Sequence, residues 1–425
     1  MERLMQYVWQ HRLWTSGSLR TTDGQDVDVL DPGIWNHDAG PDFFNAKVRI
    51  GARTWVGNVE IHLRASDWYR HGHDRDRAYD SVALHVVGAS DTAVRRPDGN
   101  MVPQLELPCA PDLRERYEAL VRNPVSELAC AGRISGIPQV YISDWINTLA
   151  FERLQQKAAR IHALASGNGG DWSYAIYITL ARALGFGTNA EPFERLALAL
   201  PLRILRKHCD SPVTLDGLVF GMAGLLDGAE RDDADVYERR MLADFRFMCV
   251  KFGLTPPREL GWKMARMRPA NFPHRRLASL AAFMAQGFRP GSELLSVADL
   301  DSARSLFDIR LSGYWARRYC FGPETARSDR AFSDASLNTL LINVAAPALY
   351  AYGSAYGQER MAELAVDILR ALPPEDNRIV RLFTAAGIPC ADAFASQALI
   401  GLRRCYCLSR KCLDCRLGYR HLSSR

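Results

Sequence analysis

The chain has 425 residues, of which 48% are hydrophobic and 24% charged, a balance typical of a globular protein with a real core. A guide of roughly 150 residues per domain predicts two or three domains. The first residues carry charged and polar groups throughout, unlike a signal peptide, and no stretch approaches the roughly 18 uninterrupted apolar residues of a membrane span. Ten cysteines in such a chain favour thiols or metal ligands over disulfides. We therefore expect a soluble, cytoplasmic protein without a membrane partner.

The net charge of +5 belongs to the C-terminal tail. Residues 401–425 contain seven Lys or Arg and one Asp, a local charge of +6, so the preceding residues sum to −1. A basic tail indicates a polyanionic partner such as DNA or RNA, and a merely solubilising tail is the alternative. The sequence points to no particular protein partner.

The N-terminal part has the pattern of a mixed α/β module. A helix is predicted over 1–14, and alternating apolar runs predict strands near 25–31, 43–50, 54–63 and 81–87. A short helix and a polar loop separate the last two strands, and Pro97-Asp98-Gly99 predicts the turn of a further hairpin.

After about residue 112 the pattern is helical almost to the end. Helical segments are expected over 143–164, 172–185, 190–207, 214–227, 234–253, 275–286, 335–352, 357–371 and 391–404. The predicted fold class is therefore α+β. An α/β module over 1–110 is followed by a mainly α-helical domain over 111–400 and a basic, Cys-rich metal-binding tail over 401–425.

Three residues with metal-binding chemistry lie on the predicted hairpin of the second and third strands. With a turn at 51–53, Asp42 falls opposite His62, and Glu60 is a diagonal neighbour on the same face. Two carboxylates and an imidazole at that range can bind one divalent cation. The arrangement depends on register, because a slip of one residue moves Asp42 across from the apolar face. An ordinary solvated polar face is the alternative.

The order helix, three strands, helix and strand is similar to the restriction-endonuclease-like PD-(D/E)XK nuclease superfamily. The match covers roughly residues 1–90, with Pro-Asp at 41–42 on the second strand and Glu-x-His at 60–62 on the third. In that superfamily an Asp and a Glu hold Mg²⁺, and a Lys helps to activate the attacking water. The resemblance implies that Asp42 and Glu60 bind Mg²⁺ or Mn²⁺.

The same resemblance implies that His62, in the place of the lysine, acts as a ligand or base. Asp42, Glu60 and His62 are then the candidate catalytic residues. The lost lysine is a departure that inactive members of the superfamily share. Glu2 of the first helix is a candidate third carboxylate, and an exposed N-terminal glutamate is the alternative.

The stretch SDWYRHGHDRDRAYDSVALHVV is rich in histidine and aspartate. His71-x-His73 with adjacent Asp residues is compatible with a first-row metal, and His85 is placed to face the same cavity as His62. A polar loop with one core histidine is the favoured interpretation, with Asp67 starting a short helix and Trp68 buried. A metal-dependent hydrolase of small substrates remains a further alternative.

The C-terminal stretch CYCLSRKCLDCRLGYRHL contains the strongest local motif. The spacing Cys407-x4-Cys412-x2-Cys415 is the one that plant-type ferredoxins use for three cluster ligands. A zinc site is equally compatible. Candidates for the fourth ligand are Cys405, Cys130, Cys390 and His421. Several iron–sulfur nucleases resembling the superfamily above also carry one cysteine far upstream, and this analogy favours Cys130.

Two segments have the composition of a nucleic-acid-binding surface. Between residues 258 and 276, six Lys or Arg alternate with Trp262 and Phe272, and the tail adds further cations. The candidate nucleic-acid-binding residues are Arg268, Arg275, Arg276, Arg403, Arg404, Arg410 and Lys411. Basic helix ends around a buried turn are the alternative for the first segment.

Across its length the chain also resembles an uncharacterised bacterial family known as a domain of unknown function. The segments that carry this likeness include GPDFFNAKV, GNVEIH, SDWYRHGH, RPANFP, INVAAPALYAYG and CYCLSRKCLDCRLG. The sequence thus predicts a metal-dependent nuclease or a nuclease-derived nucleic-acid-binding protein. A non-catalytic helical binding module with a structural metal site is the alternative.

Overall fold

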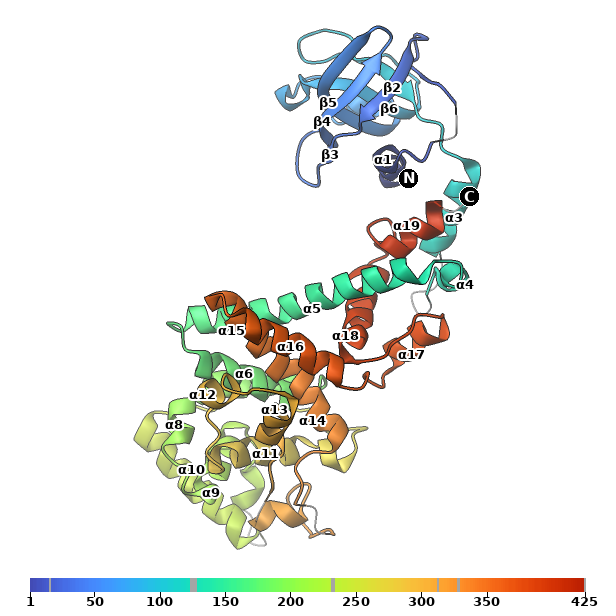
Figure 1. Cartoon of the computed structure of the whole chain (residues 1–425). Coiled ribbons are helices and arrows are strands. Elements are labelled where there is room, and N and C mark those ends of the chain that lie inside the picture. The colour runs from blue at the N-terminus through green and yellow to red at the C-terminus, as the bar shows by residue number, and fades with distance from the viewer. Residues whose placement is uncertain (15–16, 123–127, 231–233, 312, 327–328, 424–425) are drawn as a thin grey trace. The chain divides into compact units, whose positions relative to one another are not determined.

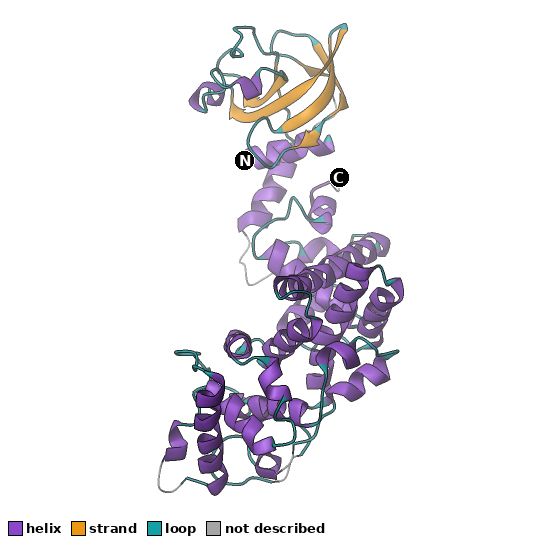
Figure 2. Cartoon of the chain, turned by 90° about the vertical axis from the view of Figure 1, so that its left-hand side faces the viewer, coloured by secondary structure: helices purple, strands orange, loops and turns teal. Residues whose placement is uncertain are grey.

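The computed structural model describes residues 1–14, 17–122, 128–230, 234–311, 313–326 and 329–423. The chain forms two compact units. The first unit comprises Met1–Trp145, Leu382–Ile388 and Leu402–Arg425, and the second comprises Ile146–Arg381 and Pro389–Gly401. The strands belong to the first unit and the second unit is helical, as the colours of Figure 2 show. The fold is thus mixed α+β, as the sequence predicts, with a sheet at the N-terminal end and a mainly helical remainder.

A mixed β-sheet forms the centre of the first unit, and within the described residues it has seven strands. The strands are β1 (Leu19–Arg20), β2 (Asp26–Asp31), β3 (Ile34–Trp35), β4 (Phe43–Ile50), β5 (Arg53–Arg64), β6 (Val82–Ala89) and β7 (Gln104–Glu106). Their order is β1-β2-β4-β5-β6-β7, with β3 beside β4. β2, β4 and β5 are antiparallel, whereas β6 runs parallel to β5 and β7 parallel to β6. The four strands predicted from the sequence are confirmed to within two residues at each end.

Helix α1 (Glu2–His11) packs against β5 and closes one face of the sheet (Figure 1). Leu4, Tyr7 and Val8 recur at helical spacing on its buried side. They share a core with the alternating apolar residues of β4 and β5, such as Val59 and Ile61. The predicted helix over 1–14 is therefore confirmed, although it ends at His11.

The other face of the sheet is covered by the connection between β5 and β6. This connection contains α2 (Asp67–Arg70) and the 3₁₀ helix η1 (Arg77–Tyr79). Trp68 is fully buried there, in a small core with Tyr79, Val82 and Val87. The predicted helix start at Asp67 with a buried Trp68 is confirmed, and Ser66 rather than Asp67 is the N-cap residue.

Helices make up most of the remaining described chain. The longer helices are α3 (Pro111–Arg122), α5 (Gln139–Gly167), α6 (Trp172–Leu184), α7 (Ala190–Ala199), α9 (Pro212–Met222), α10 (Val236–Phe252), α11 (Pro273–Ala285), α13 (Leu300–Phe307), α15 (Ala346–Tyr356), α16 (Glu359–Ala371), α17 (Arg378–Ala385), α18 (Ala393–Gly401) and α19 (Arg416–Ser423). The shorter ones are α4 (Ala131–Ile134), α8 (Leu202–Arg206), α12 (Pro290–Leu294), α14 (Asp334–Leu340), the π-helical segments η5 (Leu341–Ala345) and η6 (Leu402–Cys407), and the 3₁₀ segments η2 (Asp227–Glu230), η3 (Pro269–Asn271) and η4 (Gly313–Arg317). None of the helices in these ranges combines the length and the apolar character that a membrane crossing requires.

The helix expected over 190–207 is interrupted. α7 ends before Leu200 and α8 begins at Leu202, with Pro201 as the N-cap of α8. Proline has no N–H to donate to the preceding turn and clashes with its carbonyl, so a continuous helix stops there.

The basic tail packs inside the first unit. Leu413 and Leu422 belong to the same core as α1 and the strands, and Arg3 forms an ion pair with Asp414 at 2.7 Å. The unit therefore joins the two ends of the chain and extends from residue 1 to Trp145, beyond the boundary expected at residue 110.

Candidate metal centre

The hairpin of β4 and β5 has a tighter turn than expected. Ile50 pairs with Arg53, so the turn consists of residues 51–52 alone. The expected pairing of Asp42 with His62 is therefore wrong. Continued without a break, this register would place Asp42 on the opposite face of the sheet from His62.

A β-bulge corrects the mismatch. The ladder shifts register just after Phe43, which pairs with Val59. Within the shifted stretch, Asn45 has a left-handed φ of 55°. The bulge adds one residue to β4 and returns Asp42 to the polar face, next to Glu60.

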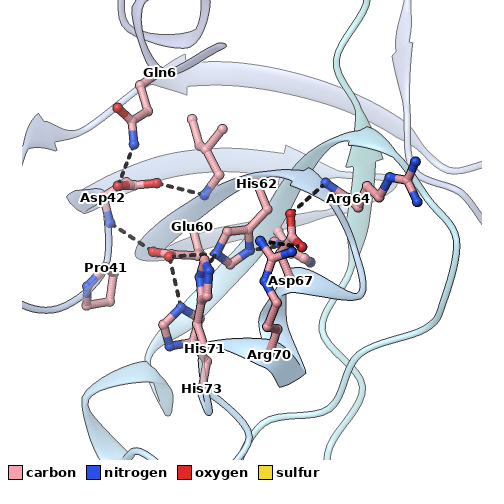
Figure 3. Close-up of polar contacts among 12 residues, drawn as sticks. Gln6, Pro41, Asp42, Glu60, His62, Arg64, Asp67, Arg70, His71 and His73 are labelled. Atoms are coloured by element: carbon pink, nitrogen blue, oxygen red, sulfur yellow. Dashed lines mark hydrogen bonds and ion pairs between the residues drawn. The ribbon is translucent and has the colours of Figure 1, made fainter. Parts of the chain in front are cut away.

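Asp42 and Glu60 are joined through the backbone. The N–H of Asp42 donates to Oε2 of Glu60 at 3.0 Å. In return, Oδ2 of Asp42 accepts the N–H of Ile61 at 2.9 Å, and Oδ1 accepts Nε2 of Gln6 from α1 at 2.8 Å (Figure 3). Both oxygens of Asp42 are thus occupied, whereas Oε1 of Glu60 points toward a group of histidines.

Two imidazoles contact that oxygen, and a third contacts one of the two. Oε1 of Glu60 lies 3.4 Å from Nε2 of His62 and 3.3 Å from Nε2 of His73. Nδ1 of His71 lies 3.1 Å from Nε2 of His62. One nitrogen from each of the three histidines lies within 4.8 Å of the other two. Figure 3 shows the three rings beside the carboxylate of Glu60, with dashed contacts from Glu60 to His62 and to His73.

The local sequence explains how two histidines of a loop reach this point. His71 follows the last turn of α2, and Gly72 has a φ of 77°, a conformation that residues with a side chain rarely adopt. The chain reverses at Gly72 so that His71 contacts His62 and His73 contacts Glu60. Trp68 anchors the start of the loop in the core, and its ring packs against that of His73 with centroids 5.4 Å apart.

A fourth histidine supports the group from the neighbouring strand. His85 of β6 pairs with Glu60 in the parallel ladder, and its Nε2 lies 2.9 Å from Nδ1 of His62. His85 is fully buried. Through this contact Nδ1 of His62 faces His85, while its Nε2 faces Glu60 and His71.

Burial controls the charge of the group. Glu60 is only 5% exposed, His62 1% and His73 8%, whereas His71 is exposed. Burial raises the pKa of Glu60 to about 8 and that of Asp42 to about 7, and the adjacent Glu60 contributes to the second shift. The charge of Glu2 in α1 also raises both pKa values.

The pKa values of the buried histidines change in the opposite direction. Burial lowers the pKa of His62 to about 3, with His73 and His71 adding to the effect. Burial also lowers the pKa of His85 to about 3 and lowers that of His73. Neutral imidazoles are the form that binds metals. Nε2 of His73 has no hydrogen-bond partner despite its burial.

Of the residues predicted from the sequence, Asp42, Glu60 and His62 lie together at this position. His71 and His73, which the favoured interpretation assigned to a polar loop, lie there as well. The His-x-His spacing beside Glu-x-His was the signal for them. What the sequence did not contain was the path of the loop.

The C-terminal cysteines form a second group in the first unit. Burial and the neighbouring thiols Cys415 and Cys130 raise the pKa of Cys407 to about 12. Burial, then Cys415 and Cys412, raise that of Cys130 to about 12. Cys130 is therefore within electrostatic range of Cys412 and Cys415. Cys405 and Cys407 both lie within η6. The donor nitrogens of the three histidines lie within 4.8 Å of one another. In the described part of the chain, no three of these thiol sulfurs lie that close together.

Three of the cations expected to contact nucleic acid are inside the protein. Arg275 and Arg276 are each 2% exposed and Arg403 is 7% exposed. Arg275 donates to the backbone carbonyls of Trp315, Arg318 and Arg330. The guanidinium of Arg276 packs over the ring of Phe186 and donates to Asn271. These side chains hold the fold together and cannot reach a phosphate, so the prediction for them is wrong. The other predicted cations are exposed: Arg268, Arg404, Arg410 and Lys411.

The chain is thus a mixed α+β protein with a buried cluster of histidines and carboxylates on its sheet. Residues 2–378 match the family described as "Protein of unknown function (DUF2851)", and the chain belongs to that family. The full-length resemblance noted in the sequence is confirmed. Neither a curated protein nor a solved structure matches the chain.

Proposed function

We propose that the first unit is a metal-dependent hydrolase of phosphodiesters, a nuclease or a nucleic-acid-binding protein derived from one. The observation that carries this proposal is the meeting of Asp42, Glu60 and His62 on the polar face of the β4–β5 hairpin. Buried carboxylates and imidazoles gathered at one point are costly unless a cation offsets them.

The order of elements supports the same proposal. Apart from the two-residue strands β1 and β3, the chain order is α1, the antiparallel strands β2, β4 and β5, the helical segments α2 and η1, and the parallel strand β6. This order is similar to that of the PD-(D/E)XK nuclease core. Asp42 precedes the second of these strands and Glu60 lies on the third. These are the positions at which the superfamily carries its two carboxylates.

The roles of the chain's own residues follow from the contacts. Glu60 presents Oε1 to the ion, and Asp42 fixes Glu60 by donating its N–H to Oε2. His62 binds with Nε2, because Nδ1 faces His85. A bound divalent ion would polarise the phosphodiester and lower the pKa of its water. DNA or RNA is the proposed partner, with Arg404, Arg410 and Lys411 as exposed cations of the same unit.

The experiment compares the wild-type protein with Glu60→Gln. Labelled single- and double-stranded DNA and RNA are incubated with Mg²⁺, Mn²⁺ or Zn²⁺, and cleavage is followed on gels. We expect metal-dependent cleavage by the wild type and none by the variant, because the amide cannot offer a charged ligand. Glu115→Gln, an exposed glutamate of α3, is the matched control and should cleave normally.

A wild-type protein that binds nucleic acid but cleaves none of these substrates with any ion would contradict a hydrolase. It would favour the non-catalytic binding module. Cleavage that Glu60→Gln retains would show that the activity lies elsewhere in the chain.

We also propose that Cys130, Cys407, Cys412 and Cys415 bind zinc or an iron–sulfur cluster that orders the tail. Burial raises the pKa of the Cys415 thiol, and hydrogen bonds from the backbone of Gly418 and Leu417 offset part of that shift. Metal analysis and absorption spectra of anaerobically purified protein distinguish zinc from an iron–sulfur cluster. Cys412→Ser should lose the metal, and a wild type with neither zinc nor iron would contradict the proposal.

A further inference from the structure

We infer that His62, His71, His73 and Glu60 together bind one divalent first-row transition ion, zinc being the best fit, and that Mg²⁺ is not its resident metal. The inference deepens the proposed function, on which it rests for the use of the site. It differs from the nuclease resemblance in both the ligands and the ion, because that resemblance implies two carboxylates and magnesium.

The distances between the donor atoms suit a single small ion. Bonds of about 2.0–2.1 Å from zinc to nitrogen or oxygen place tetrahedral ligands about 3.3–3.4 Å apart. The separations are 3.4 Å between Glu60 and His62, 3.3 Å between Glu60 and His73, and 3.1 Å between His62 and His71. The donors come from two segments of the chain, β5 and the loop after α2: the three histidine nitrogens lie within 4.8 Å of one another, and Oε1 of Glu60 contacts His62 and His73.

Two features make the nitrogen atoms of His73 and His62 available to bind a cation. Nε2 of His73 is buried and has no hydrogen-bond partner, yet it faces Oε1 of Glu60 at 3.3 Å. Nδ1 of His62 contacts Nε2 of His85, and in the tautomer in which Nδ1 of His62 is the donor, its Nε2 is available to the metal. His85 is thus the hydrogen-bond partner at the second ring nitrogen of His62, a contact that metal-bound histidines usually have.

The composition of the group decides which ion it prefers. Imidazole nitrogens suit zinc, iron and nickel, whereas Mg²⁺ requires octahedral oxygen ligands and keeps much of its water. The group has three nitrogens and one carboxylate oxygen. Asp42, the other carboxylate, has both oxygens engaged by Gln6 and by the N–H of Ile61. Asp42 is therefore outside the ligand set.

The ligands differ in their access to solvent. Glu60, His62 and His73 are buried, whereas His71 is exposed. The ion is thus held from the protein side by three ligands, and the side of His71 is the one open to water or a phosphate. Substitution of His71 also carries little risk for the fold, which makes it the informative position for a test.

The test uses cobalt(II) as a spectroscopic probe in the full-length protein. Metal is removed with a chelator and Co²⁺ is titrated in. Nitrogen and oxygen ligands produce only weak visible bands, whereas thiolates add intense charge-transfer absorption in the near ultraviolet. The absorption spectrum therefore distinguishes Co²⁺ bound by the histidines and Glu60 from Co²⁺ bound by the cysteines. Zn²⁺ and Mg²⁺ are then added as competitors.

We expect the wild type to show the visible band, Zn²⁺ to abolish it and a large excess of Mg²⁺ to leave it unchanged. His71→Ala should weaken Co²⁺ binding at least about 10-fold. The double variant His71→Ala/His73→Ala should lose the band while any thiolate absorption remains. His37→Ala, an exposed histidine of the same unit, is the control and should match the wild type. Asp42→Asn should retain the band.

A band that survives in the double variant, displacement by Mg²⁺, or loss of the band in Asp42→Asn would each overturn the inference. Circular dichroism checks the fold, and the single variant carries the test if the double variant is unfolded. The outcome is independent of cleavage. A bound ion without cleavage would overturn the proposed function alone, whereas Mg²⁺-dependent cleavage that survives His71→Ala would overturn this inference alone.

Discussion

At the level of single residues, His85 determines how His62 is presented. Its Nε2 lies 2.9 Å from Nδ1 of His62, and His85 itself is fully buried. We predict that His85→Leu lowers the affinity for Co²⁺ or Zn²⁺ about 10- to 100-fold, because Nδ1 of His62 would be buried without a partner. His85→Gln, which offers an acceptor again, should recover much of the affinity. Titration calorimetry measures both, and equal affinities for wild type and His85→Leu would exclude the supporting role.

Asp216 in α9 should make the stability of the second unit depend on pH. It is buried and accepts hydrogen bonds from the hydroxyl of Tyr237 at 2.7 Å and from Nε1 of Trp315 at 2.9 Å. Burial raises its pKa from 3.8 to about 7, and the two hydrogen bonds offset part of that shift. The pKa of Asp216 is higher in the folded protein than in the unfolded chain. Its protonated carboxyl therefore contributes fully to the stability of the folded protein below about pH 4, and this contribution is lost as the pH rises through about 7.

The variant Asp216→Asn remains neutral and retains an acceptor. We expect its melting temperature to exceed that of the wild type at pH 8 and to approach it at pH 5, with a difference in stability on the order of a few kcal/mol at the higher pH. Thermal unfolding followed by circular dichroism tests this. A difference that does not change with pH would show that Asp216 is ionised in the folded protein or that the substitution acts through packing.

At the level of elements, the bulge in β4 connects the sheet to the candidate metal centre. Asn45 has a left-handed φ of 55° and an exposed side chain, so its contribution is one of backbone conformation. A β-branched residue is strained in that region by about 1–2 kcal/mol, whereas glycine is not. We predict that Asn45→Val destabilises the first unit by this amount and weakens metal binding, because the register that brings Asp42 to Glu60 is disturbed.

Asn45→Gly is the matched control and should retain both stability and metal affinity. Denaturant unfolding and the cobalt titration give the two quantities. If Asn45→Val and Asn45→Gly behaved alike, the bulge would not depend on the conformation of this residue.

At the level of the whole molecule, the two ends of the chain share one core. Leu422 of α19 is 1% exposed and belongs to the same cluster as Leu4 of α1 and Val59 of β5. We predict that Leu422→Ala destabilises the first unit by about 2–4 kcal/mol, because it leaves a cavity in that core. Hydrogen exchange should show faster exchange in the strands, although the substitution lies more than 300 residues away in the sequence.

Leu196→Ala, a fully buried residue of α7, provides the comparison in the second unit. It should accelerate exchange in the helices around residue 196. Strand peptides that keep their protection in Leu422→Ala would show that the tail does not contribute to the N-terminal core.

Much of the secondary structure could be predicted from the sequence by itself. Alternation of apolar residues defined β2, β4, β5 and β6 to within two residues, because a sheet with one face on the core requires that period. The same local patterns identified Trp68 as a core residue and Asp42, Glu60 and His62 as neighbours. Each of these predictions depends on residues that are close in the chain or joined by one short turn.

The tertiary structure alone decided the details on which the chemistry depends. The turn at residues 51–52 and the bulge at Asn45 each move the register by one residue, and only their combination brings Asp42 to Glu60. The charge of Arg275 suggested a surface, yet carbonyl groups from distant segments surround it. The path of the loop that carries His71 and His73 is determined by the packing of Trp68 and by the reversal at Gly72. Burial and register arise from the sum of contacts across the fold, so no local pattern of residues contains them.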